Sequence, residues 1–353
     1  MNDYLIQLEL SLFSLADIFS FTTALVLGVL FLTVKSDNRR ANVFLSLFLF
    51  SLGGEVFSVL GEQFVHEDQR IFQSSLFTMP LLLLYVRRTI NRSNSFYILL
   101  LLIPGCVFNM FDISVVVIEY VFNSSILAYL LYYIRRHQRG LKSYYSNLER
   151  LTLKWIRVII IIFLGFHVLW IIEDFAVLQN ESFEYQWAGL SSLLTFFTIL
   201  WIGHNGFSQP EIFKQKLFIQ PIIDEEAEGS KAYAKQDEDS ERWTKLNMLV
   251  QEQRLYTNPK LNLRMLSDIS EIGEKEVSRL INQQEQCNFY SYINRFRVDE
   301  FKRLLNSERA GQLSMLGLAE EAGFNSKSTF YTVFKSLEGQ TPSQYKASMS
   351  KSG

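Results

Sequence analysis

The chain has 353 residues, a formal net charge of −2 and 48% hydrophobic residues. This near-neutral balance, taken over the whole chain, is not that of a nucleic-acid-binding protein, and the length allows two or more domains. The average hides two unlike parts, because residues 1–207 are dominated by apolar runs and residues 241–353 have the composition of a soluble domain.

Two cysteines and the N-terminus exclude further classes. Cys106 lies in an apolar run and Cys287 in the soluble part, so no disulfide framework or metal-ligand spacing is expected. The first residues carry no basic leader and no small-residue cleavage site, so we expect no cleaved signal peptide.

Seven apolar runs precede residue 208 and predict a seven-helix transmembrane bundle. They lie at 12–34, 41–64, 71–86, 96–111, 113–134, 155–178 and 187–207. The third and fourth are short for a hydrocarbon layer of about 30 Å. The stretch 96–134 is longer than one membrane helix, so a tight turn is expected at 109–112.

The charges of the connections predict the orientation of the bundle. Lys and Arg gather after the first, third and fifth runs, at Lys35, Arg39, Arg40, Arg87, Arg88, Arg92 and seven positions between 135 and 157. Acidic residues dominate the other connections. Because Lys and Arg mark the cytoplasmic side, the N-terminus is expected outside and everything after residue 207 in the cytoplasm.

Ionisable residues inside the predicted spans are candidates for sensing a ligand, because charge is costly in a bilayer. We single out Asp17, Glu55, Glu119, His167 and Glu173. An outward-open pocket for a cation, protons or a small polar ligand would explain them. The alternative is that they hydrogen-bond to Ser, Thr, Asn or Gln on neighbouring helices and only support packing.

Residues 208–240 are expected to connect the two parts. The stretch 209–223 is either a short amphipathic helix at the membrane surface or an unstructured tether. The stretch 224–242 is acidic and polar and predicts a solvated linker that does not bind DNA.

A first helix-turn-helix is predicted at residues 262–282, followed by a long helix. Its buried positions would be Leu263, Leu266, Ile269, Val277, Leu280 and Ile281, and its second helix would expose Lys275, Ser278, Arg279 and Asn282. The long helix would bury Phe289, Tyr292, Ile293, Phe296, Phe301, Leu304 and Leu305.

A second helix-turn-helix is predicted at residues 313–337. Gly323 favours the turn, and Asn325 or Ser326 can cap the next helix. Buried positions would be Leu316, Ala319, Ala322, Phe330, Val333, Phe334 and Leu337. The opposite face carries Lys327, Ser328, Tyr331, Thr332 and Lys335, which is typical of a recognition helix.

Residues 258–346 resemble the DNA-binding domain of the AraC family of bacterial transcription regulators. The matched positions are the run Ala322 to Ser326, then Phe330, Phe334, Lys335, Gly339, Thr341, Pro342, Tyr345 and Lys346. The resemblance implies two helix-turn-helix units held by the long helix so that both enter successive major grooves. Glu271 and Gly273 depart from the family's usual turn Gly and Ser cap. With Glu274 and Glu276 nearby, the first unit is expected to bind DNA more weakly than the second or to read fewer bases.

The predicted DNA contacts follow from the exposed faces. Lys327, Ser328 and Thr332 are expected at base edges and Lys335 at phosphate. In the first unit the candidates are Lys275, Ser278 and Arg279.

The sequence therefore predicts an all-α, non-enzymatic, membrane-embedded transcription regulator without metal or cofactor. Its expected parts are a membrane domain at 1–207, a linker at 208–240 and a DNA-binding domain at 241–353. Expected partners are promoter DNA, the bacterial inner membrane, an unidentified signal ligand, a second copy of the chain and RNA polymerase. One alternative is a membrane receptor or transporter whose cytoplasmic helices bind a protein; another makes the spans a passive anchor.

Overall fold

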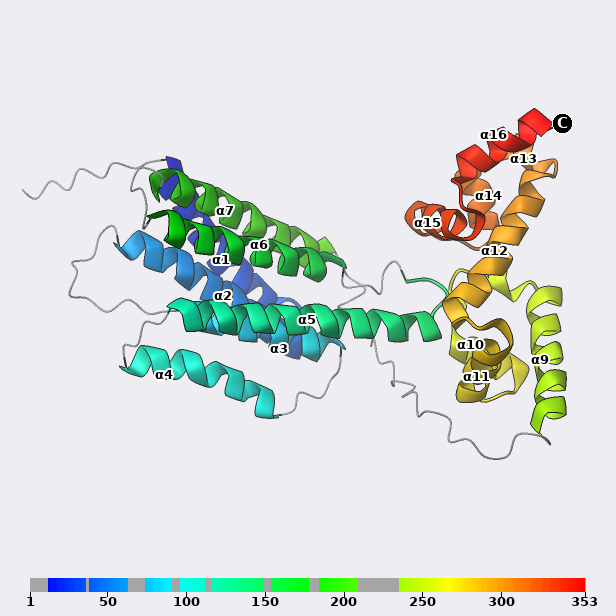
Figure 1. Cartoon of the computed structure of the whole chain (residues 1–353), viewed down its shortest axis with the longest axis horizontal. Helices are drawn as coiled ribbons and strands as arrows, with labels where there is room; N and C mark the ends of the chain where they lie inside the picture. The colour runs from blue at the N-terminus through cyan, green and yellow to red at the C-terminus, as the bar shows by residue number, and fades with distance from the viewer. Residues whose placement is uncertain are drawn as a thin grey trace, which may run out of the picture. The chain divides into compact units, whose positions relative to one another are not determined.

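The structure, a computed structural model, describes residues 12–35, 38–62, 74–90, 96–111, 116–148, 154–177, 184–208 and 235–352. Throughout these ranges the regular elements are helices, as predicted, with one isolated β-bridge between Tyr145 and Asn262. The chain forms two compact units (Figure 1). The N-terminal unit comprises Met1–Arg135 and Leu153–Phe218, and the C-terminal unit comprises Arg136–Thr152 and Ile219–Gly353.

The N-terminal unit is a bundle of long helices around one apolar core. Its elements are α1 (Leu12–Thr33), α2 (Arg39–Glu62), α3 (Ser75–Ile90), η1 (Phe96–Leu102), α4 (Ile103–Phe111), α5 (Val116–Tyr144), α6 (Lys154–Val177) and α7 (Glu184–Ser208). The last residues of α5, from Arg136, belong to the C-terminal unit. Helix α2 packs against both α1 and α3, and α7 packs against α1 and α6. Side chains such as Phe48, Leu82, Leu127 and Ile159 are buried together in the core.

Four helices of the described chain are long and apolar enough to cross a membrane: Ser14–Thr33, Arg39–Ser58, Val116–Tyr144 and Lys154–Ile172. The seven spans of the prediction are therefore not shown as such. Helix α3 has 16 residues with Pro80 inside it. The predicted fourth span is divided into a 3-10 segment of 7 residues and a helix of 9. Helix α7 has 25 residues, but polar residues such as His204 and Asn205 interrupt its apolar sequence.

Large apolar side chains on the outside of this unit contrast with polar side chains inside it. Phe19, Val117, Ile161 and Phe197 are each more than half exposed: 59%, 70%, 57% and 61%. Buried polar residues include Ser20, Asn42, Ser46, Thr78, Asn123 and His167. A unit in water would leave such an apolar surface uncovered, whereas a bilayer covers it. The arrangement favours a lipid environment.

The C-terminal unit is a set of shorter helices. They are α9 (Lys235–Glu252), η3 (Leu255–Thr257), α10 (Leu263–Ser270), α11 (Glu274–Glu285), α12 (Phe289–Leu305), α13 (Arg309–Gln312), α14 (Met315–Glu321), α15 (Lys327–Glu338) and α16 (Pro342–Ser352). Helix α12 joins two apolar cores. Phe289, Tyr292 and Ile293 pack into the first. Val298, Phe301 and Leu304 pack into the second.

Helix α9 corrects part of the predicted linker. Its first residues, from Lys235, were expected to be solvated chain, but they are helical. Arg242 and Glu238 form an i, i+4 ion pair on this helix, and Leu246 and Val250 anchor it in the first core. The possible amphipathic helix at 209–223 and the acidic residues up to 234 lie outside the described residues.

Three side chains predicted to be buried are exposed. Ile269 is 41% exposed because α10 ends at the next residue, so its last turn has little left to pack against. Leu316 is 36% exposed, since the buried face of α14 passes through Leu318 and Ala319 instead. Leu337 is 45% exposed in the last turn of α15. The remaining predicted core positions of both helix pairs are buried.

Candidate functional site

The second helix pair, α14 and α15, is capped and anchored by side chains of its own sequence. The Ser326 hydroxyl accepts a hydrogen bond from the Thr329 backbone N–H at 3.1 Å, which satisfies one free donor at the start of α15. Gly339 ends the helix with a φ of 72°. Lys302 of α12 forms an ion pair with Glu338 at 2.9 Å, so the C-terminal end of α15 is also attached to α12.

The turn before α15 depends on a glycine. Gly323 has a φ of 100°, and a Cβ at this position would lie 2.9 Å from Thr257 Cα and 3.0 Å from Arg297 Nε. No L side chain adopts this conformation comfortably or fits this space. The turn therefore approaches η3 and α12 closely, and this contact sets the direction of α15.

The outward face of α15 is free to meet a ligand. Lys327, Ser328, Thr332 and Lys335 are all exposed, as predicted. Phe330, Val333 and Phe334 on the opposite face are buried in the second core. Within the described chain neither lysine has a carboxylate partner, and Lys327 Nζ lies 5.8 Å from the centre of the Tyr331 ring. Two uncompensated cations and two hydroxyl groups thus share one helical face.

The first helix pair, α10 and α11, has a more strained turn. Asn262 caps α10 by accepting from the Met265 backbone N–H at 2.9 Å. Glu271 then adopts a left-handed φ of 58°, which costs a non-glycine residue about 1–2 kcal/mol. Gly273 begins α11 without a side-chain cap. Glu271 and Gly273, the two departures noted in the sequence, are therefore the residue with the strained backbone and the helix start without a cap.

Helix α11 does not present the face that its sequence predicts. Lys275 is exposed, but Ser278 is only 8% exposed, so its placement on the outward face was wrong. Helix α9, whose first residues were assigned to the linker and whose residues from 241 were assigned to this domain, packs against α11. The face of α11 that would be solvated in an isolated helix is therefore partly covered within the folded domain.

Arg279 is held by three side chains. Its Nη1 and Nη2 donate to the two carboxylate oxygens of Asp239, at 2.9 and 2.5 Å. Its Nε and Nη2 donate to Glu276, at 2.8 and 2.5 Å, and Nη1 also donates to Gln283 at 2.6 Å. Hydrogen bonds to Glu276 and Asp239 raise the pKa of this guanidinium above its ordinary value. The sequence did not indicate this role of Asp239, because the residue belongs to an acidic run that was predicted to be a solvated linker.

The comparisons with known proteins fall on this region. The family model described as "Helix-turn-helix domain" matches residues 266–348. The C-terminal unit contains an AraC-type helix-turn-helix domain. A probable transcriptional regulator, LumQ of Photobacterium leiognathi, is 28% identical over 109 residues, which cover 30% of this chain and 43% of that protein. The chain thus aligns with less than half of that relative. No solved structure matches. The AraC type is a non-enzymatic family, in agreement with the predicted absence of a catalytic centre.

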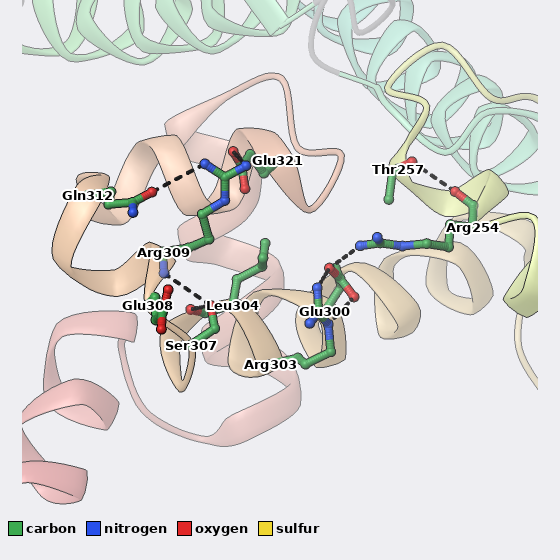
Figure 2. Close-up of a pocket in the computed structure, with 10 residues that line it drawn as sticks. All are labelled: Arg254, Thr257, Glu300, Arg303, Leu304, Ser307, Glu308, Arg309, Gln312 and Glu321. Carbon is green, nitrogen blue, oxygen red and sulfur yellow. Dashed lines mark hydrogen bonds and ion pairs between the residues drawn. The ribbon is translucent and has the colours of Figure 1, made fainter.

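A groove of about 760 Å³ lies in the helix-turn-helix domain beside α12, η3, α13 and α14 (Figure 2). Glu300 of α12 pairs with Arg254, which precedes η3, and at 2.8 Å with Arg303 one turn along α12. The remaining charges in its lining are those of Arg309, Glu308 and Glu321. Positive and negative side chains are therefore balanced, and the groove has no surplus charge with which to attract DNA.

Three of the five predicted sensing residues approach one another in the N-terminal unit. The Thr78 hydroxyl of α3 donates to the Glu55 carboxylate of α2. Glu119 of α5 lies within electrostatic range of both Glu55 and His167 of α6. Asp17 is separate from them and accepts from Ser192 of α7. The side chain of Glu173 lies outside the described residues.

The hydroxyl partners in this cluster are those that the packing alternative also requires. The Ser51 hydroxyl donates to the Ser74 carbonyl at 2.9 Å and lies 2.8 Å from the Thr78 hydroxyl. His167 Nδ1 lies 2.8 Å from the Phe163 carbonyl oxygen. Ser51 and Thr78 therefore link α2 to α3 beside the Glu55 carboxylate.

Proposed function

We propose that this chain is a membrane-embedded transcription regulator that receives a signal and binds promoter DNA in one polypeptide. The observation that carries the proposal is the exposed face of α15, where Lys327, Ser328, Thr332 and Lys335 project from a capped helix in a helix-turn-helix domain. Side chains of these types address base edges and phosphates in the major groove. The similar protein LumQ is itself named a probable transcriptional regulator.

Helix α15 is the main reading helix in this proposal. Helix α11 adds Lys275 and Arg279, but Arg279 is shared with two carboxylates and Ser278 is buried. Glu274 and Glu276 bring negative charge to the start of α11. The second helix pair therefore supplies most of the specificity, and the first mainly positions the domain.

The N-terminal unit is proposed to cross the inner membrane seven times, with the N-terminus outside and the DNA-binding domain in the cytoplasm. Four long apolar helices and the exposed apolar side chains support membrane embedding. The Lys and Arg of the odd-numbered connections support the orientation. Shorter helices such as α3 would span within a protein-lined interior or where the bilayer is locally thin.

The signal site is proposed to lie around Glu55, Glu119 and His167, where α2, α5 and α6 contribute ionisable groups close together. A small polar or cationic ligand fits their chemistry. Such a ligand shifts the protein only if it binds one packing of the helices better than another. Glu55→Gln combined with Glu119→Gln is then expected to abolish the signal-dependent change in a promoter reporter. A full response would favour the packing alternative.

Fluorescence anisotropy of promoter DNA tests the proposed DNA binding. The full chain in nanodiscs is expected to bind with an affinity that falls steeply with salt, since phosphate contacts release counterions. Lys327→Ala should weaken binding, whereas Lys245→Ala, which removes an exposed lysine from α9, should leave it unchanged. If no genomic fragment binds in a salt-dependent way, the alternative in which these helices bind a protein is favoured.

The remaining predicted partners are separate proposals. A second copy of the chain would double the number of half-sites read, and RNA polymerase would be contacted by an activator. Replacing the seven spans by an unrelated anchor separates sensing from passive anchoring. Persistence of regulation after that exchange would assign the membrane unit an anchoring role only.

A further inference from the structure

Helix α5 continues past the predicted end of its span at residue 134 and ends at Tyr144. Residues Arg136–Thr152 belong to the C-terminal unit, although both neighbouring parts of the chain belong to the N-terminal unit. Tyr144 packs against the first core of the helix-turn-helix domain. Tyr145 forms an antiparallel bridge with Asn262, and the Ser146 hydroxyl donates to the Leu261 carbonyl at 2.5 Å. A connection between two proposed spans is thus built into the DNA-binding domain.

The same segment supplies acceptors to a buried arginine. Arg297 is 1% exposed and Ser146 is fully buried. Arg297 Nη1 donates to the Ser146 carbonyl and Nη2 to the Ser146 hydroxyl, both at 3.0 Å. Asn294 of α12 also donates to the Ser146 carbonyl, at 3.1 Å. Ser146 is therefore hydrogen-bonded through both its backbone and its side chain.

The remaining donors of Arg297 are filled from within the domain. Nε donates to the Tyr256 carbonyl at 2.7 Å, Nη2 to the Asn258 carbonyl at 2.9 Å, and Nη1 to Asn294 Oδ1 at 3.3 Å. A guanidinium has five N–H donors, and here each has an acceptor. Two of these acceptors belong to Ser146. Without the segment, a buried cation would lose two hydrogen bonds, which is a costly state.

Arg297 lies where the two helix pairs meet. It follows Ile293 of the first core and precedes Val298 and Phe301 of the second core on α12. Its guanidinium lies 6.0 Å from the Phe324 ring and beside the Gly323 turn that directs α15. Anything that pulls Ser146 away from Arg297 therefore acts on the junction that fixes α15 relative to α11.

We propose that residues 141–148 are a docking segment that attaches the DNA-binding domain to the membrane unit independently of the 209–234 connection. Through it, displacement of α5 against α6 changes the packing around Arg297 and hence the presentation of α15. The docking rests on the contacts of Tyr144, Tyr145 and Ser146, whereas its regulatory role rests on the proposed function.

Retention after cleavage of the other connection tests the docking. A protease site is inserted near residue 225 of the full chain, and membranes carrying the protein are cleaved and washed at about 1 M salt, where exposed charges are screened within about 3 Å. The C-terminal fragment is expected to remain with the membranes. Release of the wild-type fragment into the supernatant would overturn the proposal. DNA is not added, so failure of the proposed function cannot produce this result.

Matched variants identify the segment responsible. Ser146→Leu places a larger side chain at a fully buried position and removes the hydroxyl that accepts from Arg297. Membranes carrying this variant should release at least tenfold more C-terminal fragment than membranes carrying the wild type. Ser143→Leu, three residues away at a half-buried position, should behave as the wild type does. Equal retention of both variants would assign the attachment to another surface and overturn the proposal.

A cross-link removes the question of whether Ser146→Leu still folds. Tyr145→Cys and Asn262→Cys are introduced into a chain lacking Cys106 and Cys287, and a disulfide is formed by mild oxidation of intact membranes. A bridged pair on antiparallel backbone is close enough for such a bond. After protease cleavage, the two fragments should migrate as one cross-linked band on a non-reducing gel. The control pair, Tyr145→Cys with Lys260→Cys, should give less of this cross-linked band. No excess of the first product over the second would contradict the docking.

Discussion

Arg279 of the first recognition helix forms a two-point ion pair with Asp239 of α9, at 2.9 and 2.5 Å. The two residues are 40 positions apart, and their ion pair joins a residue expected to lie in the linker to a helix expected to bind DNA. A carboxylate that holds a guanidinium in this way competes with a phosphate or a guanine for the same donors. The helix-turn-helix domain thus contains its own competitor for one of its candidate DNA contacts.

Asp239→Asn is expected to strengthen operator binding. The change removes the charge that competes for Arg279 while keeping the side-chain volume. A gain of about twofold to fivefold is expected, which corresponds to a loss of competition of up to about 1 kcal/mol. Anisotropy titrations of the full chain in nanodiscs measure it. Unchanged or weaker binding by a correctly folded variant would mean that Arg279 does not reach the DNA.

Lys327→Ala is expected to weaken operator binding more than Arg279→Ala does. Lys327 has no competing carboxylate in the described chain, so its full contact is available to DNA, and a base contact is worth about 1–3 kcal/mol. Paired titrations on one operator and on a scrambled sequence provide the comparison. A greater loss with Arg279→Ala would make α11, not α15, the main reading helix.

Gly323→Ala is expected to destabilise the domain by about 2–4 kcal/mol, because the new Cβ meets backbone atoms of η3 at a positive φ. Gly339→Ala is the matched control. It also has a positive φ, but its Cβ would meet nothing within 4 Å, so the loss should be about 1 kcal/mol. Pulse proteolysis of the full chain across a urea series measures both. Equal losses would show that the close approach at Gly323 is unimportant.

The Glu300 carboxylate is expected to make a contribution to the stability of the helix-turn-helix domain that is lost in acid. Hydrogen bonding from Arg303, together with the charge of Arg254, lowers the pKa of Glu300 below its ordinary value of 4.5. A lowered folded-state pKa gives stability that is present above pH 4.5 and is lost as pH falls through the folded value. The stability difference between wild type and Glu300→Gln should therefore shrink below pH 4.5 in pulse proteolysis. A difference that stays constant down to the lowest measurable pH would contradict the assignment.

The second helix pair was predictable because its signals are local. The cap at Ser326, the glycines at the turn and at the helix end, and the stripe formed by Phe330, Val333 and Phe334 each depend on residues within a few positions. The same holds for the strained turn at Glu271. Periodicity and capping chemistry operate at this range, so a single sequence reveals them.

The unpredicted features depend on residues far apart in the chain. Asp239 carried only the signal of an acidic run, and its partner is on another helix. Ser146 lies 151 positions from Arg297 and follows basic residues that marked a membrane boundary but are also good helix formers. Burial of Ser278 likewise follows from packing within the folded unit, not from its own helix. Tertiary contacts of this kind leave no periodic trace.

Chromatin capture from the membrane fraction tests the central claim most directly. Cells expressing the full chain are cross-linked, membranes are isolated, and the DNA attached to the protein is sequenced alongside that of Lys327→Ala. We expect discrete promoter regions to be enriched with the membrane-bound wild type and to be lost with the variant, at equal protein levels. Equal recovery of DNA by both proteins, without discrete regions, would contradict a membrane-embedded regulator that reads DNA through α15.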